Sequence, residues 1–479
     1  MSYQNRLSHY KKSITKNNFI SIIRSIGEAI SGTDKDFTTT RLSKAILLLA
    51  IPMILEMIME SIFAITDIFF VSKLGPNAIA TVGLTESLLT IIYAIGMGLS
   101  MGTTALISRR IGEKRPYTAS VTAVQSIIAG ALVSIVIGIP AIIYSKDLLQ
   151  IMGASLEIVE SGYLYASILL GSNIIIMLLF IINAVFRSSG DAAISMRVLF
   201  LANFANIILD PIFIFGFGPI PAFGIKGAAI ATTIGRGLAV LFQFYILFKG
   251  NGRIKIFKKA IRVNLKVMID LIKISLGGIL QSLIAHSSWI GMVRIIAIFG
   301  STALAGYTIA IRIIIFVLLP SWGLSNAAAT LVGQNLGAKK PERAEKAVWS
   351  TGYLNVILLS LISLIFITNP DFFIKIFTAE TAVIISGAQG LRIISFGFIF
   401  YAMGMVMIQA FNGAGDTRTP TYINILCFWA IEIPLAYYLA TQTGMKEFGV
   451  YTAIIVAESI MTVFAMYLFK RGHWKNEKV

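Results

Sequence analysis

Residues 98–116 read GLSMGTTALISRRIGEKRP, and residues 323–341 read GLSNAAATLVGQNLGAKKP. Both stretches place two glycines and a proline at the same positions, 225 residues apart. The chain therefore consists of two homologous halves, and such a repeat determines the architecture before any single residue is considered. The offset holds without a gap for seven pairs: Gly75 and Gly300, Gly98 and Gly323, Gly112 and Gly337, Pro116 and Pro341, Gly190 and Gly415, Asp191 and Asp416, Gly224 and Gly449.

The composition indicates an integral membrane protein. The 479 residues are 56% hydrophobic and 13% charged, with a mean hydropathy of +0.82. Soluble domains carry roughly 25% charged residues, so most of this chain is expected to be out of contact with water. The single cysteine, Cys427, lies in an apolar stretch, which excludes a disulfide framework. The first forty residues are polar and basic, and we expect no cleavable signal peptide.

Apolar stretches of spanning length recur along the chain. A spanning helix needs about 20 residues, and backbone groups in lipid must be paired within the segment, so helices are expected. No segment shows the period-two alternation of a barrel strand. We predict an all-α membrane protein with twelve transmembrane helices, at about 43–72, 77–107, 118–144, 161–187, 194–217, 224–249, 269–299, 302–333, 343–368, 384–412, 419–441 and 447–470.

Basic residues gather in the tails and in every second loop. They cluster in the N-terminal tail, in residues 109–115, in the central segment 249–273 and in residues 339–346. Loops rich in Lys and Arg stay in the cytoplasm, so we expect both termini and the central linker to be cytoplasmic. The net charge of +17 then reflects topology and attraction to membrane lipid. No loop is long enough for a nucleic-acid-binding domain.

Five segments follow from these spans. Six helices separate each residue from its counterpart, so the two six-helix lobes should be related by a pseudo-two-fold axis along the membrane normal. The N-terminal tail forms either a short interfacial helix, with Phe19, Ile22, Ile23, Ile26 and Ile30 on one face, or a disordered segment. The segments are a basic tail at 1–42, an N-lobe at 43–249, a basic linker at 250–268, a C-lobe at 269–470 and a tail at 471–479.

Charged residues inside predicted spans need a partner, a wet cavity or a function, because each costs at least roughly 2.5–3.5 kcal/mol at the bilayer centre. The arginines can also snorkel or form structural ion pairs. The charged residues in the predicted spans are Glu56, Glu60, Asp67, Glu86, Asp210, Arg236, Arg294, Arg312, Arg392, Glu432 and Glu458.

Asp67 and Asp210 differ from the others in their neighbours. Asp67 follows Pro52, which interrupts the hydrogen-bond ladder of the first helix. Asn206 lies four residues before Asp210, on the same helix face. Two carboxylates, an amide oxygen and a nearby hydroxyl suit Na⁺ or, when protonated, a pair of protons. The alternative is two aspartates bonded to helix ends or to arginines.

Several ordered motifs resemble the multidrug and toxic compound extrusion (MATE) family over about residues 40–470. The resemblance implies a secondary antiporter that exports drugs and other organic compounds in exchange for Na⁺ or H⁺. It implies neither an enzyme nor a cofactor. We expect a monomer in the cytoplasmic (inner) membrane of a bacterium or archaeon. The motifs are DIFFVSKLG at 67–75, AIA at 78–80, Gly112, Asn183, FRSSGD at 186–191, Asn206 with Asp210-Pro211, GAAIAT at 227–232, GQNLGA at 333–338 and NGAGDTRTP at 412–420.

The resemblance also implies roles for individual residues. It assigns the cation site to Asp67, Asn206, Asp210 and Thr232. Tyr165 and Asn183 match polar residues that line the N-lobe cavity, although both also fit ordinary helix–helix hydrogen bonds. Pro52 matches a proline at which the first helix bends in some members.

The second half departs from one family pattern. Some branches carry an acidic pair in the C-lobe, with a glutamate midway along the seventh helix. Here the region from Gln281 to His286 contains no carboxylate, so a C-lobe cation site of that kind is not expected. His286 is the nearest titratable group, and it serves either as a proton relay or as a hydrogen-bonded packing residue.

Two other functions compete with drug antiport. A lipid-linked oligosaccharide flippase of the same superfamily would share the two lobes, but such proteins typically line the cavity with many basic residues. An intramembrane enzyme would carry short catalytic motifs that are missing here. The proposed cation residues are also not duplicated. The counterparts of Asp67, Asn206, Asp210 and Thr232 in the second half are Met292, Ile431, Leu435 and Ala457.

Overall fold

The described part of the chain is almost entirely helical. The structure, a computed structural model, describes residues 24–249, 252–477 and 479, which form no β-strand beyond one isolated bridge between Phe217 and Ile220. The first half contains α2 (Leu42–Ser72), α3 (Pro76–Gly112), α4 (Pro116–Ile143), α5 (Ser145–Ile151), α6 (Leu156–Gly171), α7 (Asn173–Ser189), α8 (Ala192–Phe215) and α9 (Ile225–Lys249). The second half contains α10 (Leu265–Ile296), α11 (Ser301–Gly337), α12 (Pro341–Thr368), α13 (Pro370–Lys375), α14 (Thr381–Ser395), α15 (Phe398–Ala414), α16 (Arg418–Asn424), a π-helical segment (Ile425–Glu432), α17 (Ile433–Gln442) and α18 (Glu447–Arg471).

The predicted all-α membrane fold is confirmed. In the part of the chain that is described, eleven helical segments are long and apolar enough to span a membrane, and the bent pair α14 and α15 makes a twelfth. The pair bends by 56° at a break next to Gly397, and the fourth span of the first half is interrupted at the matching residue Ser172, between α6 and α7. The sequence alone predicted both spans as continuous. The repeat therefore extends to the interruptions of its helices.

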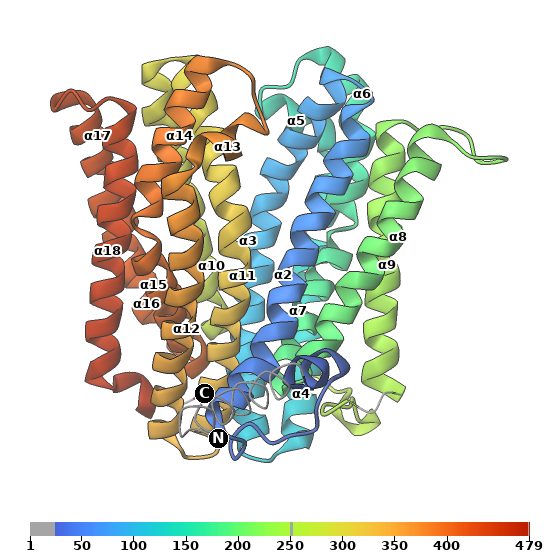
Figure 1. The fold of residues 1–479 in the computed structure, drawn as a ribbon. Coiled ribbons are helices and arrows are strands. Elements are labelled where there is room, and N and C mark those ends of the chain that lie inside the picture. The colour runs from blue at the N-terminus through green and yellow to red at the C-terminus, as the bar shows by residue number, and fades with distance from the viewer. Residues whose placement is uncertain (1–23, 250–251, 478) are drawn as a thin grey trace, which may run out of the picture.

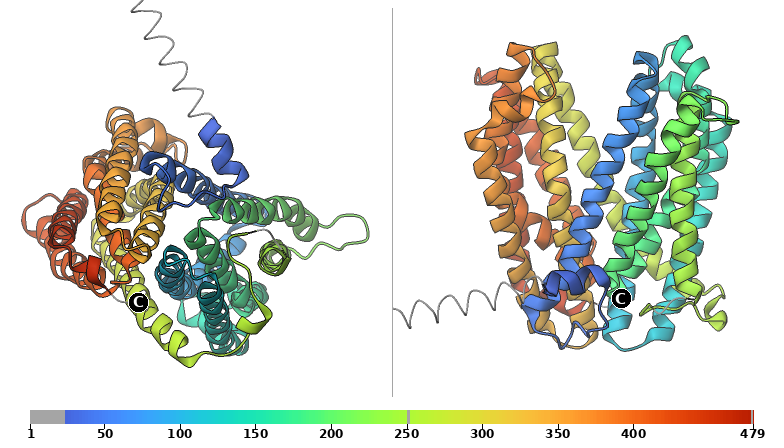
Figure 2. Two further views of the ribbon diagram at one scale, coloured as in Figure 1. Left: turned by 90° about the horizontal axis from the view of Figure 1, so that it is seen from below. Right: turned by 45° about the vertical axis from the view of Figure 1, so that its right-hand side comes forward.

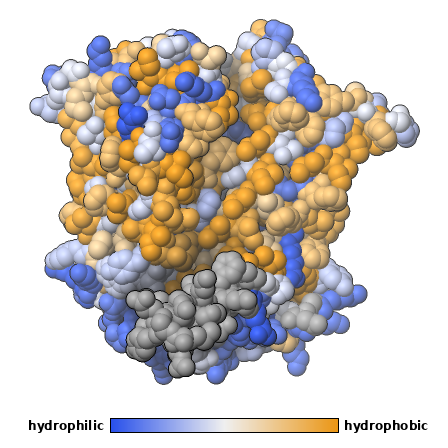
Figure 3. Space-filling view, viewed as in Figure 1, coloured by the Kyte–Doolittle hydropathy of each residue, from blue (hydrophilic) through white to orange (hydrophobic). Residues whose placement is uncertain are grey.

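Two lobes make up the molecule. The N-lobe contains α2–α9 and the C-lobe contains α10–α18, and the two lie side by side in Figures 1 and 2. They converge at the end where α2 and α10 begin, here called the linker end, and diverge at the opposite end, here called the open end (Figure 2). Figure 3 shows a belt of hydrophobic side chains between hydrophilic ends, and a notch between the lobes at the open end. This surface matches the two boundaries of a bilayer.

The lobes meet at the linker end through two reciprocal backbone contacts between α3 and α11. A Cβ atom on Gly112 would overlap the carbonyl group of Gln334, and a Cβ atom on Gly337 would overlap the carbonyl group of Arg109. Arg109 and Gln334 are themselves 225 residues apart, as are the two glycines. Each half thus makes the same contact with the other around the pseudo-two-fold axis. Only glycine allows this approach of two helix backbones.

A second reciprocal contact lies further along the same helices. A Cβ atom on Gly98 of α3 would overlap the backbone of Ile279 in α10, and one on Gly323 of α11 would overlap the backbone of Met53 and Ile54 in α2. Ile54 and Ile279 again match at the repeat offset. Four of the glycines that reveal the repeat in the sequence therefore form the seam between the lobes.

The segments outside the bundle attach to its linker end. The part of the N-terminal segment that is described is helical over 24–31, and its Ile26 and Ile30 are each 39% exposed. Phe19, Ile22 and Ile23, also expected on that apolar face, lie outside the described residues. Hydrogen bonds from Lys35 and Lys44 lower the pKa of Glu28 to about 2. A lowered pKa means that this contact stabilises the fold above the unfolded-state pKa and is lost only as the pH falls toward 2.

The central linker is tied to both the tail and the N-lobe. The backbone N–H of Arg253 donates to Asp191 Oδ2 at 2.6 Å, and its guanidinium donates to the carbonyls of Thr33 and Lys35 at 2.8 and 2.6 Å. The helix α10 begins at Leu265, four residues before the predicted span. The linker is thus bonded to the linker end of the bundle through Arg253.

We expect a methyl group in the α3–α11 seam to destabilise the protein. Gly112→Ala and Gly337→Ala should each lower the free energy of unfolding by about 1–3 kcal/mol, since neither backbone can retreat without moving a lobe. Gly83→Ala is the matched control in α3, where a Cβ meets open space, and it should be neutral or stabilise by up to about 1 kcal/mol. Thermal unfolding in detergent measures both effects. Equal melting temperatures for the seam and control variants would contradict the close contact.

Candidate functional site

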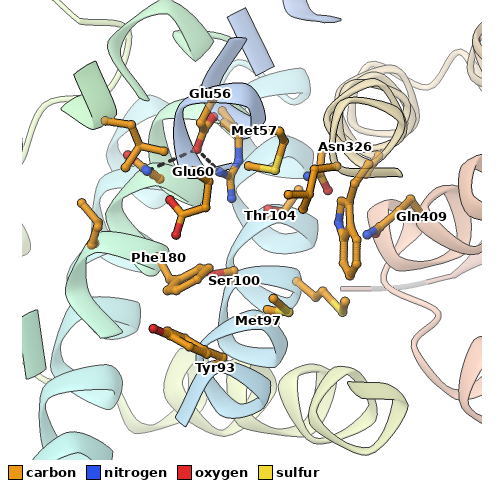
Figure 4. Close-up of a pocket in the computed structure, with 18 of the residues that line it drawn as sticks. Glu56, Met57, Glu60, Tyr93, Met97, Ser100, Thr104, Phe180, Asn326 and Gln409 are labelled. Carbon is orange, nitrogen blue, oxygen red and sulfur yellow. Dashed lines mark hydrogen bonds and ion pairs between the residues drawn. The ribbon is translucent and has the colours of Figure 1, made fainter. Parts of the chain in front are cut away.

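A cavity lies between the two lobes, above their seam. Its volume is about 220 Å³. The N-lobe contributes side chains from α2, α3, α7, α8 and α9, and the C-lobe contributes side chains from α11 and α15 (Figure 4). A cavity with walls from both lobes changes shape whenever the lobes move relative to one another. The lining includes Glu56, Met57, Glu60, Tyr93, Met97, Ser100, Met101, Thr104, Phe180, Asn183, Arg187, Arg236, Trp322, Asn326, Gln409 and Asn412.

The cavity wall combines aromatic rings, thioethers and the carboxylate of Glu60, which forms no ion pair with any other described residue. Tyr93 and Phe180 pack with ring centroids 5.9 Å apart and ring planes inclined by 58°, and Trp322 of the C-lobe also lines the cavity. Methionines are flexible and polarizable, so they adapt to ligands of different shapes. Glu60 points into the same space from α2 (Figure 4). This chemistry suits organic molecules with aromatic rings and a positive charge.

Glu56 forms a buried ion pair at the edge of the cavity. Its Oε1 accepts hydrogen bonds from Arg187 Nη1 at 2.5 Å and from Asn183 Nδ2 at 3.2 Å. Asn183 Oδ1 in turn accepts from Gln243 Nε2 at 2.7 Å. The side chain of Glu56 is 1% exposed and that of Arg187 is 12% exposed. This network neutralises Arg187 and joins α2, α7 and α9.

The structure brings together the four residues expected to bind the cation. Thr232 Oγ1 donates to Asp67 Oδ1 at 3.4 Å, and Asn206 Nδ2 donates to Asp210 Oδ1 at 3.0 Å and reaches Thr232 Oγ1 at 3.4 Å. Asn206 and Asp210 are fully buried, and Thr232 is 6% exposed. The helices α2, α8 and α9, which contact one another, supply these groups.

Two oxygens of this cluster have no hydrogen-bond partner among the described residues. They are Asn206 Oδ1 and Asp210 Oδ2, both buried. Buried acceptors without partners are costly, and a cation or a proton would satisfy them. The donor set consists of hard oxygens, as Na⁺ prefers, and its two carboxylates can also take up protons. The residues present therefore fit either coupling ion.

Arg236 connects the polar cluster with the cavity. It lies on α9 one turn after Thr232, it is 9% exposed, and its guanidinium lies 4.5 Å above the Phe63 ring. Its charge interacts with both Glu60 in the cavity wall and Asp67 in the polar cluster. From the sequence we expected snorkelling or a structural ion pair for this arginine. Its interaction with both carboxylates of α2 depends on the packing of α2 against α9.

The other residues singled out from the sequence have separate places. Asn183 lines the cavity, as the resemblance implied. Tyr165 is not among the lining side chains; it is 2% exposed in α6, within electrostatic reach of Asp67. Pro52 lies inside α2, which continues as one helix through it. His286 donates from Nδ1 to the Ser282 carbonyl of its own helix at 2.7 Å.

Sequence reasoning missed the aromatic and C-lobe parts of the cavity. Tyr93, Trp322 and Gln409 line it, yet each is an isolated polar or aromatic residue in an apolar span. Such residues form no readable spacing. Only the position of the lobes brings α3, α11 and α15 to one space.

Comparisons with known proteins agree with this architecture. The MatE family profile matches residues 52–212 and 278–438, one stretch in each lobe. The probable multidrug resistance protein NorM of Thermotoga maritima is 24% identical over 438 residues, which cover 91% of this chain and 94% of that protein. The multidrug export protein MepA of Staphylococcus aureus is 25% identical over 436 residues, with coverages of 90% and 94%.

A solved structure gives the same result for the fold. It is described as the outward-facing conformation of a multidrug resistance MATE family transporter of the MOP superfamily. The TM-score is 0.85 at 26% sequence identity, and the match covers 91% of this chain and 97% of that chain.

Breaking the Glu56–Arg187 pair should be strongly destabilising. Glu56→Ala leaves a buried guanidinium without its partner, and we expect a loss of about 3–5 kcal/mol in the free energy of unfolding. The double variant Glu56→Gln, Arg187→Met should recover much of this loss, because no charge remains buried. Glu160→Gln, which breaks the exposed pair with Lys146, is the control and should change nothing measurable. Thermal unfolding in detergent measures these differences. Equal melting temperatures for Glu56→Ala and the control Glu160→Gln would refute the stabilising role of the pair.

Proposed function

The chain belongs to the multidrug and toxic compound extrusion (MATE) family, and from that premise we propose that it is a secondary antiporter driven by Na⁺ or H⁺. Members of this family are membrane transporters and not enzymes, and relatives of this chain carry names of multidrug export proteins. The chain is accordingly a multidrug efflux transporter of the multi-pass membrane type. The coupling ion, its site and the mechanism are the proposal.

One observation carries the coupling proposal: the N-lobe holds a polar cluster beside, but separate from, the cavity. Asp67 and Glu60 lie two turns apart on α2, one in the cluster and the other in the cavity wall. Thr232 and Arg236 lie one turn apart on α9, Thr232 in the cluster and Arg236 in the cavity wall. A ligand in one place therefore acts on the same two helices as a ligand in the other.

The arrangement of the lobes supports an outward-facing state. Basic loops lie at the linker end, and the positive-inside rule puts that end in the cytoplasm, together with both termini. The lobes are in contact there and diverge at the open end. In a bacterial or archaeal inner membrane, the cavity would then face the outside. This is the state that releases a drug and takes up the coupling ion.

Arg236 gives a physical route for the exchange. When Asp67 and Asp210 are negatively charged, they attract the guanidinium and leave Glu60 free to hold a cationic substrate. When Na⁺ or H⁺ neutralises the cluster, Arg236 is drawn to Glu60 and competes with the substrate for that carboxylate. Cation binding thus favours drug release, through a difference in affinity between two states of one protein.

The polarity of the cavity favours drugs over lipid-linked oligosaccharides. A flippase of this superfamily would be expected to line its cavity with many basic residues. Here Arg187 is paired with Glu56, and the charge of Arg236 interacts with those of Glu60 and Asp67. The remaining surface is aromatic and thioether-rich. We infer an organic, often cationic, small-molecule substrate and a monomer as the working unit.

Removing either carboxylate of the cluster should abolish exchange. Asp67→Asn and Asp210→Asn should each stop efflux of an ethidium-like cation from proteoliposomes while expression and folding are kept. Asp147→Asn, an exposed residue of α5, is the control and should transport at the wild-type rate. Imposing Na⁺ and pH gradients independently identifies the coupling ion. Wild-type efflux by either cluster variant would refute the site assignment.

Arg236 should be required for coupling more than for substrate binding. In the wild type, Na⁺ or protons should weaken binding of an ethidium-like cation by about 5–150-fold, the usual range of coupling between two sites. In Arg236→Gln this factor should fall close to one, whereas Arg392→Gln in the C-lobe should keep it. Fluorescence titrations with and without the coupling ion measure the factor. An unchanged factor in Arg236→Gln would exclude the proposed competition for Glu60.

A further inference from the structure

The C-lobe buries two carboxylates that the proposed N-lobe coupling does not use. Glu432 ends the π-helical segment and is 6% exposed, and Glu458 lies in the middle of α18 and is 7% exposed. Neither takes part in an ion pair among the residues that the structure describes. Two unpaired carboxylates inside a membrane span are costly, and such residues mark ion or proton pathways.

The surroundings of the pair are polar but uncharged. Ser288 of α10 donates to Glu432 Oε2 at 2.6 Å. Glu458 Oε2 is buried and accepts no hydrogen bond within the described chain. The π-helical segment and α18, which carry the two carboxylates, contact each other, and the negative charges of the two side chains repel each other. The other titratable groups within electrostatic reach of these two carboxylates are Tyr307 of α11, Tyr401 of α15 and Cys427 of the π-helical segment.

The pair occupies the same helices of its lobe as the N-lobe cluster. In the N-lobe, the first, fifth and sixth helices supply Asp67, Asp210 with Asn206, and Thr232. In the C-lobe, the corresponding helices supply Ser288, Glu432 and Glu458. Glu432 directly follows Ile431, the counterpart of Asn206, and Glu458 directly follows Ala457, the counterpart of Thr232. The 225-residue repeat offset pairs the N-lobe residues with Ile431 and Ala457, each one residue before a glutamate of the pair.

The π-helical segment explains part of that shift. A π-helical turn takes up one more residue than an α-helical turn, because its hydrogen bonds run from i to i+5. The segment Ile425–Glu432 therefore rotates Glu432 back toward the direction that residue 431 would have in a regular helix. That direction is the one in which Asn206 faces its own cluster in the N-lobe. Turns of this kind are frequent at functional sites.

From these observations we propose that Glu432 and Glu458, with Ser288, form a second proton-binding site in the C-lobe. One proton adds to a carboxylate oxygen of the pair when the site is reached from one side of the membrane, and it leaves to water when the site is reached from the other. The proton satisfies the unpartnered Glu458 oxygen and removes the repulsion between the two carboxylates. This inference rests on the proposed antiport, and it adds a second ion to each transport cycle.

Infrared difference spectroscopy between acidic and alkaline pH tests the site without relying on transport. Protonated carboxylic acids have a carbonyl stretching band that disappears on ionisation. In the Asp67→Asn, Asp210→Asn double variant, in which the N-lobe site is removed, a pH-dependent carboxylic acid band should remain. Adding Glu432→Gln or Glu458→Gln to that background should remove one component of that band, while the components from the other carboxyl groups of the chain, such as Glu60, stay. Glu447→Gln, at the start of α18, is the matched control and should leave that component unchanged.

A conservative variant reports the position of the proton. Ser288→Ala removes the hydrogen bond to Glu432 without removing a carboxylate, so the band should shift in frequency and not vanish. If one glutamine variant fails to fold, the other glutamine variant and Ser288→Ala still decide the matter.

Two results would overturn the proposal. One is that, in the Asp67→Asn, Asp210→Asn background, none of the substitutions Glu432→Gln, Glu458→Gln and Ser288→Ala alters the pH-dependent band. The other is a spectral change that follows Na⁺ at constant pH and does not follow pH. If Asp67→Asn loses transport and keeps the infrared band assigned to Glu432 and Glu458, both sites are supported independently. If Asp67→Asn still transports and keeps that band, only the N-lobe assignment is refuted.

Discussion

The close approach of α3 and α11 at the linker end is the constraint on which the rest of the structure depends. Gly112 against Gln334 and Gly337 against Arg109 are the same contact made twice around one axis. Without side chains at these glycines, the two lobes can touch backbone to backbone and diverge above. The cavity exists because of that divergence. Any motion that opens the linker end must first separate this seam.

The scaffold is symmetric while its chemistry is not. In the N-lobe, two aspartates, an amide and a hydroxyl form a hydrogen-bonded cluster that Arg236 connects to the cavity. In the C-lobe, the corresponding helices carry Glu432 and Glu458, and no arginine of the described chain interacts with the charges of these two carboxylates. Duplication thus supplied two equivalent places for polar groups in apolar helices. Sequence divergence then gave each place its own set of polar side chains.

The sequence predicted the spans and the four residues of the N-lobe cluster because both leave local or family-specific signals, such as apolar length and the Asn206…Asp210 spacing. It did not predict that Glu56 pairs with Arg187, nor that the charge of Arg236 interacts with those of both Glu60 and Asp67. Those contacts join α2 to α7 and α9, more than a hundred residues away. Glu432 and Glu458 were noted as charged residues within the spans, but the fixed repeat offset did not align them with the N-lobe cluster. At Glu432 the reason is the π-helical turn, which shifts the register by one residue.

The central claim is that ion binding at Asp67 and Asp210 shifts the balance between two arrangements of the lobes. Double electron–electron resonance measures the distance between spin labels at Ile151→Cys and Ile376→Cys, and thus the separation of the lobes, most directly. Both residues are exposed, repeat-related and located at the open end. The native Cys427 is buried and should stay unlabelled. The account predicts that Na⁺ or protons increase the population with the longer distance, and that Asp67→Asn with Asp210→Asn removes this response. A distance distribution that ignores both ions, or that responds equally in the double variant, would contradict it.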